Sequence, residues 1–444
     1  SLFRQAFWPG GLAALVGDDA ATDRWLATLA AQEIVQARPE SRFEREREYV
    51  FRHSFVREAA YATLTESDRV TGHRLAGKWL SAAGETNTVA LAEHFERGKE
   101  PARAAVHWER AAEQAMEGND LALGIQLAAR GVRCASEATA AARLEAMRAE
   151  AYRWRGELAE ARACAMRAME LAEEATGGWF NAVSQLAYAS ISVGDLGPVI
   201  AATAKLEATR PAAADLDPYL LALSRVATCL AYGGETELAN RVHARMDEAL
   251  GWGEPSEAIL ARVRLSTALR AMRLKDDVAT LACFGGALEV FERIGDRRGG
   301  MYVRLNLGVI QMELGDFDRA ERAFREAIDA GIATGVRSIA IGARVNLGLL
   351  RAYRGAFDEA LELLGGARAE YEKLGDPRMT GAARNYEALV QLLGGHAAEA
   401  EREAAAASSA LGTLPTTRAD ALATRARALV VLGRADEALE AATA

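Results

Sequence analysis

The chain has 444 residues, half of them hydrophobic, so it can bury a large core. Its 62 acidic and 53 basic residues give a net charge of −9, and no block of Lys and Arg could neutralise a row of phosphates, so we expect no direct nucleic-acid partner. Alanine is abundant, prolines number only 9, and alternating β-branched runs are missing, which predicts an all-α fold. No run approaches the roughly 18 apolar residues of a membrane span, so we expect no membrane partner either.

Four cysteines lie far apart and form no CxxC pair. This spacing is typical of buried free thiols in a reducing compartment, so we expect a cytoplasmic location. Residues 1–10 lack the pattern of a secretory signal. The helical pattern at Glu437–Ala444 is still running where the sequence stops, and we expect this chain to be part of a longer protein.

The first hundred residues are richer in aromatic and charged residues than the rest. A strand-like run at Tyr49–Phe51 leads into a helical pattern that continues to Leu64, and a second helical pattern covers residues 67–80. We therefore expect a separate small helical module at residues 1–100 and a second domain at residues 101–444.

An internal repeat dominates the second domain. Its mark is a glycine followed five residues later by a small residue, with successive marks 38, 40, 40, 41, 40, 40 and 38 residues apart. The marked pairs are Gly156/Ala161, Gly194/Val199, Gly234/Ala239, Leu274/Ala279, Gly315/Ala320, Gly355/Ala360, Gly395/Ala400 and Gly433/Ala438.

Each repeat predicts a helical hairpin. A glycine can adopt the left-handed conformation that ends the first helix, an Asp such as Asp316 can cap the second, and the small residue lets the two helices approach closely. Neither helix can bury its apolar face alone, so the hairpins should stack into a superhelix. We expect about nine hairpins, at residues 101–134, 138–175, 179–209, 216–250, 255–294, 298–333, 336–374, 377–411 and 416–444.

Two of these repeats share a pattern of residues, at Leu307, Gly308, Ala320, Phe324 and Ala327 in one repeat and at Leu347, Gly348, Ala360 and Ala367 in the next. This pattern resembles the signature of the tetratricopeptide repeat family. The resemblance implies a right-handed superhelical solenoid, and the period near 40 resembles the long-helix variants of signalling and motor-adaptor proteins. The repeats around Gly156, Gly194 and Gly395 depart from the signature, because alanines replace several large residues.

The segment Phe51–Tyr61 resembles another group. Its Phe-x-His-x-x-x-Arg-Glu-Ala-Ala-Tyr run is similar to the winged-helix end of bacterial signal-transduction ATPases with numerous domains. In that family the winged helix precedes a helical sensor array, and the nucleotide-binding domain, often joined to a kinase or cyclase domain, lies upstream. The resemblance implies a winged-helix-like module at residues 1–100 and an ATPase domain of the same chain as a partner.

Motifs for catalysis, cofactors and metals are not recognisable. Gly72–Lys78 matches the first seven positions of a phosphate-binding loop, but Trp79 stands where Ser or Thr would bind magnesium and the run lies within a helical pattern. The six histidines form neither HxxxH nor HExxH. We expect no enzyme activity, no cofactor and no metal site in these residues.

Asparagines recur at the period of the array. Asn306 and Asn346 directly precede the Leu-Gly pairs, and Asn385 lies one residue out of step. In 40-residue tetratricopeptide proteins this position commonly lies on the concave face and binds the backbone of an extended peptide, because an amide offers both a donor and an acceptor. The alternative is a structural role between adjacent hairpins.

A row of arginines has the same period, at Arg264, Arg304, Arg344 and Arg384. Arginine stems often cover apolar helix edges and pair with acidic residues, and we favour that interpretation here. If the row faced the groove, it would prefer an acidic peptide or a carboxylate.

Three classes of function remain: an effector-binding sensor region of a multidomain signal-transduction ATPase, a free-standing adaptor scaffold, and a peptide-responsive transcription regulator. We adopt the first, because this chain begins with a winged-helix-like module, whereas an adaptor normally begins with a capping repeat. In this hypothesis a protein, peptide or other effector binds the concave surface, changes the curvature of the array and regulates an upstream nucleotide-binding or kinase domain.

Overall fold

The computed structural model describes residues 2–3, 6–412 and 414–444. The chain divides into two compact units. Unit 1 contains residues 1–118 and 123–144, and unit 2 contains residues 119–122 and 145–444. The sequence-based domain limits at 1–100 and 101–444 remain predictions.

Unit 1 begins with a small sheet flanked by helices. The strands are β1 (Ala6–Phe7), β2 (Val35–Ala37) and β3 (Tyr49–Phe51), in the order β1-β3-β2 with antiparallel pairing. The last strand coincides with the predicted one. The helices of this part are α1 (Pro9–Val16), α2 (Asp19–Ala31), α3 (Ser54–Ala62), α4 (Glu66–Ala82) and α5 (Thr88–Arg97).

Aromatic packing and a helix cap stabilise this module. The rings of Trp8 and Trp79 stack 5.6 Å apart, and Phe43 packs against Trp8 at 4.7 Å, which ties the sheet side to α4. Helix α4 begins with a capping box between Thr65 and Asp68. The run Gly72–Lys78 lies inside this continuous helix, so its amides are used by helical hydrogen bonds.

All nine predicted hairpins are present as pairs of α-helices. Their bounds are α6 (Pro101–Glu117) and α7 (Leu121–Cys134); α8 (Ala138–Arg155) and α9 (Leu158–Leu171); α10 (Gly177–Val193) and α11 (Gly197–Ala208); α12 (Leu216–Tyr232) and α13 (Thr236–Ala249); α14 (Glu257–Arg273) and α15 (Asp277–Arg293); α16 (Arg297–Glu313) and α17 (Phe317–Ala333); α18 (Arg337–Tyr353) and α19 (Phe357–Leu374); α20 (Pro377–Leu393) and α21 (Ala397–Ala410); α22 (Pro415–Val431) and α23 (Ala435–Thr443). The short 3₁₀ helices η1 (Ala213–Asp215) and η2 (Leu250–Trp252) flank α12 and α13.

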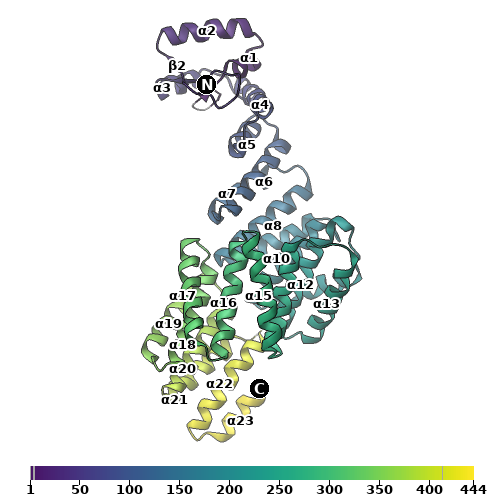
Figure 1. The fold of residues 1–444 in the computed structure, drawn as a ribbon, viewed down its shortest axis with the longest axis vertical. Helices are drawn as coiled ribbons and strands as arrows, with labels where there is room; N and C mark the ends of the chain where they lie inside the picture. The colour runs from purple at the N-terminus through teal and green to yellow at the C-terminus, as the bar shows by residue number, and fades with distance from the viewer. Residues whose placement is uncertain (1, 4–5, 413) are drawn as a thin grey trace. The chain divides into compact units, whose positions relative to one another are not determined.

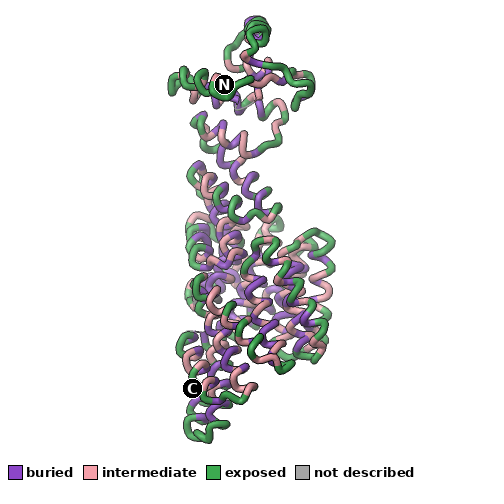
Figure 2. The backbone as a smooth tube through the Cα atoms, turned by 90° about the vertical axis from the view of Figure 1, so that its left-hand side faces the viewer, coloured by how far each residue is buried: buried purple, intermediate pink, exposed green. Residues whose placement is uncertain are grey.

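Consecutive helices of unit 2 pack in series from α9 to α13 and from α14 to α23, and α12 packs against α14. Figure 1 shows them as a stacked array from teal to yellow. Apolar faces meet between neighbours, as where Ala320 and Phe324 of α17 are fully buried. Figure 2 shows buried segments alternating with exposed ones along these helices. The array is therefore a solenoid of tetratricopeptide-like hairpins, the expected fold class.

Left-handed residues end the first helix of the repeats. Gly156, Gly194 and Gly234 have φ of 82°, 75° and 91°, and the later glycine marks behave alike. The repeat with Leu274 in place of glycine shifts this turn by one residue, because Lys275 takes the left-handed conformation with φ of 59°. A non-glycine residue there has a steric cost of about 1 kcal/mol.

We expect Lys275→Gly to raise the free energy of unfolding by about 1 kcal/mol, because glycine removes that cost. Lys275 Nζ lies 3.0 Å from Glu313 Oε2, but both side chains are exposed, so losing the pair should cost little. Urea unfolding of wild type, Lys275→Gly and Lys275→Ala measures the effect. Equal stability of the glycine and alanine variants would contradict the prediction.

In the part of the chain that the structure describes, no helix is long and apolar enough to cross a bilayer.

Candidate functional site: the central cavity of unit 2

Unit 2 encloses a cavity of ≈ 360 Å³. Most of its lining comes from the first helices of successive hairpins, from α8 to α22. Polar and aromatic side chains dominate this lining: Arg153, Tyr188, Thr228, Tyr232, Arg273, Tyr302, Asn306, Ser338, Asn346, Tyr371, Asp376, Arg378, Asn385, Tyr386, Thr416, Thr417 and Asp420.

The cavity exists because distant repeats of unit 2 meet. The Ser338 hydroxyl donates to the Trp154 carbonyl at 3.4 Å, and the Thr416 hydroxyl donates to the Tyr232 carbonyl. Each bond joins residues 184 positions apart, more than four repeats, and α10 packs against α20. The superhelix of this unit therefore closes on itself around the cavity.

Two of the helix-ending glycines also lie at these closing contacts. A Cβ on Gly156 would meet Leu374 Cδ1 at 3.0 Å, and one on Gly234 would meet Pro415 Cγ at 2.8 Å. At Gly315, which has nearly the same φ, nothing lies within 4 Å. Gly156 and Gly234 thus end a helix and also leave room for a later repeat.

We expect Gly234→Ala to lower the free energy of unfolding by about 1–2 kcal/mol more than Gly315→Ala does. Both variants strain a left-handed residue, but only the first places a methyl group against Pro415. Denaturant unfolding of the two variants gives the difference. Equal losses would show that the closing contact adds nothing to stability.

The structure brings the three predicted asparagines to the same cavity. Asn306 Nδ2 donates to the Tyr302 carbonyl at 2.8 Å, one turn earlier in α16. Asn385 is only 6% exposed, and among the described residues no donor reaches its buried Oδ1 atom. Its neighbour Tyr386, which is in step with Asn306 and Asn346, lines the cavity as well.

The four predicted arginines lie elsewhere, outside the lining of this cavity. Arg304 pairs with Glu292 at 2.6 Å, Arg344 with Glu370 at 2.6 Å and Arg384 with Glu403 at 3.5 Å. Arg264 donates to the Gly286 carbonyl at 3.4 Å. Each contact reaches a second helix of a hairpin, which agrees with the packing interpretation.

Tyrosines supply neutral hydrogen-bonding groups to the cavity. Burial raises the pKa of Tyr302 and Tyr371 well above the ordinary value, and it raises the pKa of Tyr386 to about 12. Their phenols therefore keep their protons at neutral pH. Arg273 and Arg378 place their guanidinium carbons 5.4 and 5.8 Å from the ring centre of Tyr232, which adds cation–π contacts.

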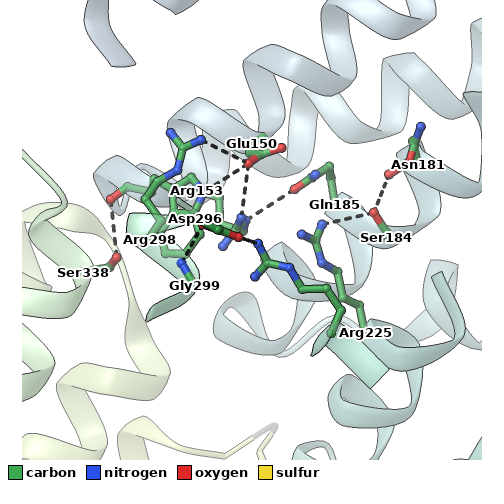
Figure 3. A network of polar contacts seen from close by, with 12 residues as sticks. Glu150, Arg153, Asn181, Ser184, Gln185, Arg225, Asp296, Arg298, Gly299 and Ser338 are labelled. Atoms are coloured by element: carbon green, nitrogen blue, oxygen red, sulfur yellow. Dashed lines mark hydrogen bonds and ion pairs between the residues drawn. The ribbon is translucent and has the colours of Figure 1, made fainter. Parts of the chain in front are cut away.

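A second polar network borders the cavity (Figure 3). Glu150 Oε1 lies 4.0 Å from an Nη2 atom of both Arg153 and Arg298, and it accepts a hydrogen bond from Trp154 Nε1 at 3.2 Å. Burial by itself would raise the pKa of Glu150, but Arg153, Arg225 and Arg298 outweigh it and lower the pKa to about 2. Glu150 is therefore ionised at neutral pH.

Sequence reasoning missed this arginine cluster. Arg153, Arg225, Arg262 and Arg298 come from α8, α12, α14 and α16, but they do not follow the 40-residue period. Their only common signal is a place on the first helix of a hairpin, which many other residues share. Among the residues that the structure describes, no three or more His, Cys, Asp or Glu side chains group together so that they could bind a metal ion.

We expect Glu150→Gln to lower the free energy of unfolding at neutral pH by about 1–3 kcal/mol, since it leaves guanidinium groups without a counter-charge. A third of the Glu150 side chain is exposed, which holds the effect below that of a fully buried pair. The pKa of Glu150 is depressed on folding. The stabilisation from its charge is therefore complete above about pH 4.5 and is lost as the pH falls towards about 2.

Urea unfolding of wild type and Glu150→Gln from pH 7 down into this window checks the prediction. Glu257→Gln is the matched control, because Glu257 pairs with Arg293 on the surface with both side chains about 60% exposed. A difference between wild type and Glu150→Gln that does not shrink as the pH falls would contradict the assignment.

Comparison with known proteins agrees with this architecture. Residues 302–330, in α16 and α17, match the family model described as tetratricopeptide repeat. No curated protein matches the chain in sequence.

Solved structures with similar folds share little sequence. A Rap protein complexed with competence and sporulation factor has a TM-score of 0.49 and 13% identity, covering 60% of this chain and 74% of that chain. A signal transduction ATPase with numerous domains and a tetratricopeptide repeat sensor, from Pyrococcus horikoshii, has a TM-score of 0.42 and 14% identity; the alignment covers all of this chain and 60% of that one.

Aspartyl phosphate phosphatase F from Bacillus subtilis also has a TM-score of 0.42 and 14% identity, covering 87% of this chain and 89% of that chain. Together with the match at residues 302–330, the hairpin geometry identifies this chain as a helical-repeat protein that contains a tetratricopeptide repeat.

Proposed function

We propose that unit 2 binds an extended peptide segment of a partner in its central cavity. The observation that carries the proposal is Asn385, whose buried Oδ1 receives no hydrogen bond from the described residues although the residue lines the cavity. A buried acceptor without a donor costs about 1–3 kcal/mol, and a peptide N–H would satisfy it.

Asn306 and Asn346 extend this surface at the same position of successive first helices. An asparagine side chain can donate to a peptide carbonyl and accept from a peptide N–H, so a ladder of them binds a main chain whatever its sequence. The tyrosines of the cavity add flat apolar surfaces with a polar tip, which suits side chains of mixed character. Selectivity would then come from the groups between the asparagines.

We further propose that this binding belongs to a sensor region that regulates an upstream ATPase or kinase domain. Support comes from the order of elements in unit 1, where α1 and α2 are followed by the β2–β3 hairpin, an arrangement in keeping with a winged helix. The Phe51–Tyr61 run begins at the last residue of β3 and covers most of the following helix, α3. The reading frame that precedes Ser1 in the gene tests this part: a phosphate-binding loop is expected there, and a frame without one would contradict the ATPase assignment.

Capture from native lysate tests peptide binding. We expect Asn306→Ala/Asn346→Ala to lose a partner that wild type retains, with affinity reduced about 10- to 100-fold, because two hydrogen bonds of about 1–1.5 kcal/mol each disappear. The captured partner is identified by mass spectrometry, and a synthetic peptide from it is titrated calorimetrically.

Asn240→Ala, an exposed asparagine on α13, is the matched control and should bind like wild type. Arg304→Ala/Arg344→Ala should also bind like wild type if the arginine row only pairs with carboxylates. Undiminished affinity of the double asparagine variant would place the binding surface elsewhere.

A further inference from the structure

A smaller hollow of ≈ 60 Å³ adjoins the central cavity. The two share Arg153, Tyr188, Ile191, Thr228 and Tyr302 in their linings. A space of this size holds a few water molecules or one small polar group, but no side chain of a large residue. It is therefore suited to receive the end of a ligand rather than its body.

Three of the residues that line this hollow are arginines. Arg153, Arg225 and Arg262 line it, and Arg153 is only 5% exposed. The guanidinium carbon of Arg153 lies 4.1 Å from the ring centre of Trp154 and 4.7 Å from that of Tyr188, so aromatic faces hold it in place. Its Nε donates to the Gln185 side-chain oxygen at 3.3 Å, which fixes the direction of the fork.

Carboxylates do not balance this charge. Asp296 pairs with Arg262, while Glu150 is shared between Arg153 and Arg298 at 4.0 Å from each. Arg225 donates to the Ser184 hydroxyl at 3.1 Å, and no carboxylate of the described residues lies within ion-pair distance of it. Burial, followed by the charge of Arg153, lowers the pKa of Arg225 to about 9, which expresses the cost of keeping it charged without a counter-ion.

We propose that this hollow is a site for one oxyanion group, a carboxylate or phosphate, which binds between Arg153 and Arg225. The guanidinium fork matches the geometry of both groups, and the low dielectric around the hollow strengthens the attraction. The proposal deepens the proposed function and rests on it only for the source of the oxyanion: in a peptide ligand the acidic end enters the small hollow while the main chain follows the asparagines.

Thermal unfolding in different anions tests the site without knowledge of the natural ligand. The chain of 444 residues is unfolded in sodium phosphate and in sodium chloride at equal ionic strength. We expect the midpoint of wild type to be about 3 °C higher in phosphate, since an anion that binds only the folded state stabilises it. Arg225→Met should lose this difference, and Arg225→Lys should retain only part of it, because an ammonium lacks the fork.

The matched control is Arg293→Met, which removes an exposed arginine of α15 and should keep the full phosphate effect. A purely structural role of Arg225 would lower the midpoint of Arg225→Met equally in both salts and leave the phosphate difference unchanged. That result, or equal midpoints of wild type in the two salts, would overturn the proposal.

Model peptides distinguish the sources of the oxyanion. N-acetyl-trialanine with a free carboxyl terminus and the same peptide with an amide terminus are compared with inorganic phosphate as additives. If the unfolding midpoint rises with the free acid but not with the amide, the site binds a peptide carboxylate. If the midpoint rises with phosphate alone, the site binds a phosphate group. Failure of the peptide function would leave the phosphate effect intact, and failure of the oxyanion site would leave asparagine-dependent capture intact.

Discussion

The contacts that close the superhelix of unit 2 are the constraint on which the site depends. A stack of hairpins buries its apolar faces between neighbours and needs no contact between distant repeats. Here Ser338 and Thr416 donate to carbonyls 184 residues earlier, and Leu374 and Pro415 fit over glycines that have no side chain. This closure gives the inner face of the array a cavity that is lined by helices from α8 to α22.

Burial changes the chemistry of the residues that line the cavity. Arg153, Asp376 and Asn385 are each at most 6% exposed, so each buried polar group must find a partner or carry the cost of lacking one. The tyrosines respond by staying neutral, as their raised pKa values show, whereas the arginines around Glu150 stay charged and share too few carboxylates. The interior thus combines neutral hydrogen-bonding groups along its length with a positive charge at one place.

These two features together indicate which kind of ligand would fit the proposed site. The asparagines recur with the repeat and suit a regular main chain, while the arginine cluster occurs once and suits a single terminal group. A ligand that satisfied both would contact residues from α8 to α22 across several repeats. In the proposed sensor function it would also have to distinguish two arrangements of the array, since a ligand shifts a conformational equilibrium only by binding its states unequally.

The sequence by itself determined the local architecture. A period near 40 placed the eight hairpins from residue 138 onward, because helix length and the glycine turn are encoded within one repeat. The resemblance to tetratricopeptide repeats, not the period, suggested the inner face for Asn306 and Asn346, which line the cavity. Only the tertiary structure decided which repeats close on each other, and with them the cluster of Arg153, Arg225, Arg262 and Arg298. Small rotations between neighbouring hairpins add up over more than four repeats, so no single repeat encodes the closure, and the cluster joins residues that share no register.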